Sequence, residues 1–95
     1  IDIVLELKKK DITADELNKA FEEAAAGDYK GIITTNDDEL VSVDYRGNEH
    51  TAVIDTPLTL TMAGGMVKII AWYDNEWGYS RRIIDMIRFL AEKGL

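Results

Sequence analysis

The sequence contains no cysteine, which excludes disulfide bonds, thiolate nucleophiles and thiolate metal ligands. It has one histidine, His50, which follows a polar turn and has no nucleophile near it in sequence, so we expect a structural role for it. The single proline, Pro57, should stand at the start of a strand rather than inside one. No apolar run approaches the roughly 20 residues of a membrane span, so no membrane partner is expected.

Positive charge is also scarce. The chain has 11 Lys and Arg against 18 Asp and Glu, a formal net charge of −7, which repels phosphate backbones and argues against nucleic-acid binding. The acidic run at residues 36–39 lacks the spacing of a calcium loop, and we interpret it as a solvated turn. Gly64-Gly65 lacks the context of a phosphate-binding loop. The sequence therefore predicts no metal site and no phosphate loop.

Catalytic nucleophiles are equally few, since Ser42 and Ser80 are the only serines. Gly78-Tyr79-Ser80 resembles the start of a nucleophile elbow, but Arg82 stands where that motif needs a second Gly. We expect Ser80 to cap a helix instead. The following Arg81 and Arg82 oppose the helix dipole and should make tertiary contacts, with a weak anion site as the alternative. No catalytic residue is predicted.

With 95 residues, 46% of them hydrophobic, the chain is expected to form one globular domain over residues 1–95. It begins with Ile1 rather than Met, which we take as a sign of a trimmed or excised piece. Thr13 and Glu16 form a capping box for a helix that ends before Gly27, and Ser80 begins a second helix that ends at Lys93. Alternation of apolar residues predicts strands at 1–9, 32–35, 40–45, 51–54, 58–62 and 66–73.

These elements predict an α+β fold with two layers. We expect a mixed or mainly antiparallel sheet of about five strands, with both helices packed on one face. The other face would then carry Val4 and one side of residues 66–73 without cover. Such an apolar face favours a homodimer through the sheet or contact with another domain.

The segment WYDNEWGYS, residues 72–80, has the most distinctive composition. Taken alone it predicts a corner between a strand and a helix: Trp72 and Tyr73 pack at the strand end, Asp74 and Asn75 bond the turn backbone, and Gly78 permits the bend. A ligand site is the alternative, because tyrosine and tryptophan combine an apolar body with a polar tip.

Residues 66–80, MVKIIAWYDNEWGYS, resemble the C-terminal signature of phosphorylating glyceraldehyde-3-phosphate dehydrogenase. Weaker resemblances precede it in the right order: IDIVLEL at 1–7, the helix and strand at 11–32, and the stretch from Leu40 to Asp55. Together they cover essentially the whole chain.

The resemblance implies which functional parts of the family this chain lacks and which of its residues match the family's site. The family's dinucleotide-binding domain, nucleophilic Cys, His base and phosphate-binding residues all precede the matching region, and His50 does not correspond to the catalytic His. Two positions carry over: Asn75 matches the Asn that contacts the nicotinamide carboxamide, and Tyr79 matches the Tyr beside the nicotinamide. We expect them to be remnants of a pocket, with no cofactor held by this chain although the family uses NAD. The resemblance also implies a cytoplasmic location.

Some positions depart from the family pattern, among them Arg81, Thr51-Ala52 and the last helix at 86–95. The strong helix formers of this last helix indicate an engineered or redesigned fragment, although a natural homologue cut short would look similar. The sequence therefore predicts a stand-alone domain without catalytic activity of its own. The alternatives are a self-associating module that uses the sheet face, and a fragment of an active NAD-dependent aldehyde dehydrogenase of the glycolytic type.

Overall fold

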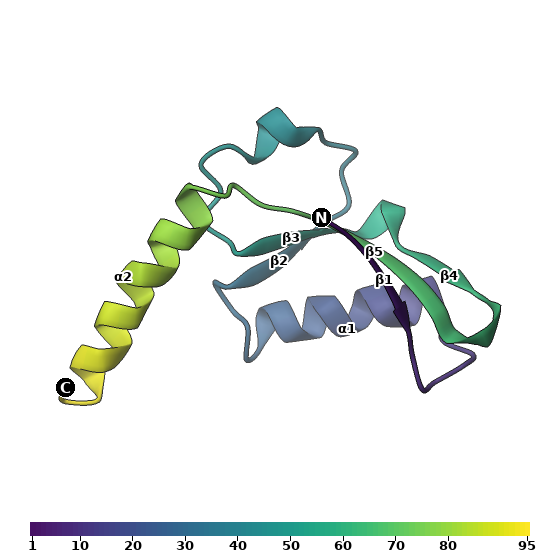
Figure 1. Ribbon diagram of the computed structural model, residues 1–95, viewed down its shortest axis with the longest axis horizontal. Helices are drawn as coiled ribbons and strands as arrows, with labels where there is room; N and C mark the ends of the chain where they lie inside the picture. Colours follow the sequence, from purple (N-terminus) through teal and green to yellow (C-terminus); the bar gives the residue numbers. More distant parts are fainter.

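The structure, a computed structural model that describes all residues 1–95, contains a mixed five-stranded sheet and two α-helices (Figure 1). This confirms the predicted α+β fold class. The regular elements are β1 (Asp2–Glu6), α1 (Ala14–Ala26), β2 (Ile33–Asn36), β3 (Ala52–Asp55), β4 (Leu60–Met62), β5 (Met66–Trp72) and α2 (Trp77–Glu92).

Strand β5 organises the sheet, whose order is β1-β5-β3-β2. β1 pairs antiparallel along most of β5, whereas β4 and β3 pair antiparallel with its first and second halves on the other side. β2 lies parallel to β3 at the far edge. The predicted hairpin-like connection through Ala63–Gly65 joins β4 to β5.

The helix α1 covers one face of this sheet. Its start is the predicted capping box: the Thr13 hydroxyl accepts the Glu16 N–H at 3.2 Å, and the Glu16 carboxylate accepts the Thr13 N–H at 2.9 Å. The core beneath α1 alternates along β5, where Val67, Ile69 and Ala71 are buried, in keeping with the period of two in a strand. The other residues packed into this core are Ile54, Leu7, Ile12, Leu17, Phe21 and Ala52.

The opposite face of the sheet has no helix on it. Val4, Leu60 and Met62 are each more than half exposed there, and the intervening residues of β5 are only partly buried. The prediction of an uncovered apolar face is thus confirmed.

The second helix lies differently from the prediction. α2 leaves the corner after β5 and extends away from the sheet (Figure 1); its apolar residues Ile83, Ile84, Ile87 and Leu90 are between 39% and 62% exposed. The radius of gyration, 15.1 Å, exceeds the roughly 13 Å of a compact 100-residue domain. Only the first turns of α2 have partners on the rest of the fold, so its stripe stays bare. It also begins at Trp77 rather than at Ser80.

The expected strand at 40–45 is wrong. Residues Ser42–Tyr45 form a 3₁₀ turn, because the Asp44 carboxylate accepts the Val41 N–H at 2.9 Å and bends the backbone locally. The turn has a tertiary role: it buries Tyr45, whose ring stacks on Trp72 with centroids 5.3 Å apart and planes 5° from parallel.

Candidate functional site at the corner after β5

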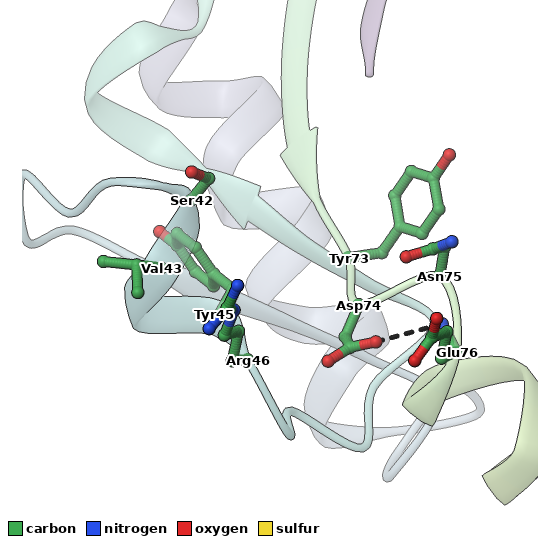
Figure 2. A pocket seen from close by; sticks show the side chains of 8 residues that line it. All are labelled: Ser42, Val43, Tyr45, Arg46, Tyr73, Asp74, Asn75 and Glu76. Carbon is green, nitrogen blue, oxygen red and sulfur yellow. Dashed lines mark hydrogen bonds between the residues drawn. The ribbon is translucent and has the colours of Figure 1, made fainter.

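Asp74 ties three segments together at this corner. Its carboxylate accepts backbone N–H bonds from Gly47 at 2.9 Å, Glu76 at 3.0 Å and Trp77 at 2.9 Å. The bond to Glu76 is the dashed line in Figure 2, which also shows Tyr73 pointing away from the Asp74 side chain. Trp77 is the first residue of α2 and Glu76 is the residue before it, so the Asp74 side chain bonds the start of the helix, whereas Ser80 lies inside the helix.

The same bonds lower the pKa of the Asp74 carboxyl below its ordinary value of 3.8, with the Gly47 N–H as the largest cause, followed by Trp77 and Glu76. A pKa depressed in the folded state makes the ionised carboxylate a stabilising group. Its contribution is complete above the pKa of the unfolded chain and is lost as the pH falls through the lower folded value.

We therefore expect Asp74→Asn to melt at a lower temperature than the wild type at pH 7, because the amide accepts fewer and weaker bonds. The difference should shrink as the pH falls below about 4, where the wild type loses the charge. Circular dichroism melts across this range measure it. Asp28→Asn is the matched control, since Asp28 makes no ion pair or side-chain hydrogen bond; a pH-independent gap for Asp74→Asn would contradict the explanation.

Gly78 lets α2 approach the rest of the fold. It is buried, and a Cβ at this position would lie 2.9 Å from the His50 carbonyl oxygen, closer than real Cβ contacts allow. Glycine is required here by close packing inside the first turn of the helix and not by the predicted bend, since Gly78 does not adopt a positive φ. Arg81 and Arg82 add the expected tertiary contacts there, to Glu49 at 3.4 Å and to the Thr51 hydroxyl at 3.2 Å.

The two residues singled out for the cofactor, Asn75 and Tyr79, line one cavity of about 580 Å³. Its apolar wall includes Phe21 of α1, and Ile3, Ile54 and Ala71 from the face of the sheet that α1 covers. Neither the Asn75 amide nor the Tyr79 hydroxyl makes a hydrogen bond within the chain, and both residues are exposed. The expectation that Asn75 bonds the turn backbone is therefore wrong; its polar groups are free for a partner.

The other candidates are bonded locally. The Ser80 hydroxyl donates to the Glu76 carbonyl oxygen at 2.8 Å inside α2, and His50 Nδ1 lies 3.0 Å from the Asn48 side-chain oxygen. No hydrogen bond joins Ser80 to His50, and no cluster of three metal-ligating side chains is present. Sequence reasoning underrated Asp74, whose role depends on a partner 27 residues away.

Comparisons with known proteins show the family of this chain. Residues 1–75 match the family model for the glyceraldehyde 3-phosphate dehydrogenase C-terminal domain. The chain belongs to this family. It is similar to glyceraldehyde-3-phosphate dehydrogenase 1 of Bacillus subtilis, with 50% identity over 100% of this chain and 28% of that protein. It is also similar to the chloroplastic glyceraldehyde-3-phosphate dehydrogenase GAPB of Arabidopsis thaliana, with 47% identity over 98% of this chain and 21% of that protein.

The dehydrogenase relatives are much longer than this chain. The chain spans only about a quarter of their length, 28% and 21% in the two cases. The family model includes Asn75 and ends before Tyr79, whereas the Bacillus match continues through the last helix. That continuous match gives no support for an engineered origin. One relative is chloroplastic, so the cytoplasmic location stays a prediction; no helix here is long and apolar enough to cross a membrane.

Proposed function

We propose that this chain forms the C-terminal wall of a nicotinamide pocket in a glyceraldehyde-3-phosphate dehydrogenase and does not catalyse the reaction alone. The observation that carries this proposal is the placement of Asn75 and Tyr79 on one cavity with unbonded polar groups. A carboxamide side chain can donate to and accept from another carboxamide, and an exposed tyrosine ring offers a flat surface to an aromatic ring. NAD, when bound, would supply the hydride acceptor.

The chemistry of the family explains why the chain alone would be inactive. The aldehyde is oxidised through a covalent adduct with a thiol, and this chain has no cysteine. Ser80 and His50 offer no substitute, since each is bonded within its own turn. Two contacts to a nicotinamide also cannot offset the translational and rotational cost of binding, which is at least about 4 kcal/mol. We expect no measurable NAD binding by the isolated chain.

The test separates these two claims. The purified chain, given glyceraldehyde 3-phosphate, NAD and phosphate, should form no NADH by absorbance at 340 nm. A chimera in which this chain replaces the matching segment of the Bacillus subtilis relative, to which it is 50% identical, should be active. In that chimera Asn75→Ala should raise the KM for NAD about 3–10-fold, the value of one hydrogen bond.

For the aromatic position, the matched control is a second tyrosine, Tyr29, which lies outside the cavity. Tyr79→Ala should lower kcat/KM for NAD in the chimera, whereas Tyr29→Ala, in the turn after α1 and outside the cavity, should leave it unchanged. NADH formation by the chain alone would refute the absence of catalysis. An active chimera indifferent to both Asn75→Ala and Tyr79→Ala would refute the assignment of the pocket.

A further inference from the structure

Asn75 lies in a turn that the residue before it holds closed. The Asp74 Oδ1 atom accepts the N–H groups of Glu76 at 3.0 Å and of Trp77 at 2.9 Å, which closes an Asx turn. The Asp74 carbonyl oxygen also accepts the Gly78 N–H at 3.0 Å. All three bonds span Asn75, whose own side chain makes no hydrogen bond within the chain. The position of Asn75 therefore depends on its neighbour.

The other carboxylate oxygen of Asp74 anchors this turn to the body of the fold. Asp74 Oδ2 accepts the N–H of Gly47, a residue 27 positions away in the sequence, at 2.9 Å. Gly47 follows closely after Tyr45, which is buried and stacks on Trp72. One carboxylate thus closes the turn around Asn75 and also ties that turn to a packed part of the structure.

We propose that Asp74 is a positioning residue of the nicotinamide pocket, which holds the Asn75 carboxamide in place for a nicotinamide carboxamide. This role rests on the proposed function, because it concerns a residue of that same pocket. Asp74 also lines the cavity, but its two carboxylate oxygens already accept three N–H groups, so it acts through Asn75. A hydrogen bond weakens steeply when its angle departs from linear, so a loose turn would weaken the contact.

The mobility of Asn75 in the purified chain tests the positioning without any cofactor. Asp74→Ala removes all three side-chain bonds, and the order parameter of the Asn75 backbone N–H, from 15N relaxation, should fall from about 0.85 to below about 0.6. Glu76→Ala is the matched control, because it also removes a carboxylate beside Asn75 but one that makes no hydrogen bond or ion pair. An unchanged order parameter in Asp74→Ala would overturn the proposal.

Kinetics of the active chimera test whether this placement matters for the cofactor. Asp74→Ala should raise the KM for NAD about 3–10-fold, as Asn75→Ala does, because both lose the same hydrogen bond. The double variant should have the same KM as Asn75→Ala alone, since Asp74 then has nothing left to position. Asp74→Asn should raise the KM less than Asp74→Ala, because its one carbonyl oxygen can still accept the two N–H groups that follow Asn75.

The outcomes separate the positioning role from the pocket itself. If Asn75→Ala leaves the KM for NAD unchanged, the pocket assignment fails and the positioning role falls with it. If Asn75→Ala raises the KM and Asp74→Ala does not, the pocket stands and the positioning role alone is overturned. Additive effects of the two substitutions would also overturn it, because a loss that is merely structural does not depend on Asn75. If Asp74→Ala does not fold by circular dichroism, Asp74→Asn takes its place in the same double-mutant cycle and decides.

Discussion

Gly65→Ala should destabilise the chain by about 3 kcal/mol or more, a large share of the stability of a small domain. Gly65 adopts φ +78°, which costs a residue with a Cβ roughly 1–2 kcal/mol. A Cβ there would also lie 2.7 Å from the Leu7 carbonyl oxygen and 3.1 Å from that of Lys9. Both contacts are to backbone, which cannot move without loosening β1 from β5.

The neighbouring glycine provides the control. Gly64 adopts φ +82°, but a Cβ there would meet no atom within 4 Å. Gly64→Ala should therefore cost only the backbone strain, about 1 kcal/mol. Urea unfolding followed by circular dichroism compares the two variants. Similar losses for both would show that the close approach to β1 contributes nothing.

Trp72→Phe should cost about 1–3 kcal/mol, although the substitution keeps an aromatic ring against Tyr45. The Trp72 indole Nε1 donates to the Asp55 carboxyl at 2.8 Å, and Asp55 is only 3% exposed. Phenylalanine has no donor, so the buried carboxyl group is left without this partner and cannot recover it from water. Denaturant unfolding by circular dichroism avoids the change in tryptophan fluorescence.

Trp77→Phe is the matched control, since Trp77 is 54% exposed and its indole makes no hydrogen bond; its cost should stay below about 0.5 kcal/mol. A double-mutant cycle isolates the bond. Trp72→Phe combined with Asp55→Ala should cost less than the sum of the two single variants. Strict additivity would mean that the indole–carboxyl bond is not the source of the loss.

The contacts at the corner after β5 bear on the proposed pocket because they flank Asn75 and Tyr79 along the chain. Asn75 lies between Asp74, which holds the turn, and the first turn of α2, in which Gly78 contacts His50. Tyr79 follows Gly78 directly. Precise placement of a binding side chain depends on such supporting contacts, so stability variants at the corner should also change NAD kinetics in the chimera.

The sequence by itself determined the features that depend on neighbours along the chain. The capping box of Thr13 and Glu16 joins residues three apart, the alternation along β5 follows from its pleat, and the glycines at 64 and 65 turn the chain back within a few residues. The lack of cysteine likewise excluded thiol chemistry without any structure, and the run at 66–80 was enough to indicate the family.

Only the tertiary structure determined which residues bond at the corner after β5 and in which direction α2 extends. The Asp74 side chain joins the start of α2 to residues 46–48, because its carboxylate accepts the Trp77 and Gly47 N–H groups, each at 2.9 Å. Residues 40–45 alternate like a strand, yet the Asp44 carboxylate accepts the Val41 N–H and bends them, and Tyr45 stacks on Trp72. The spacing of the apolar residues of α2, Ile83, Ile84, Ile87 and Leu90, is typical of a helix face buried in a core, yet these residues are exposed. Whether it is covered depends on surfaces that local periodicity does not encode.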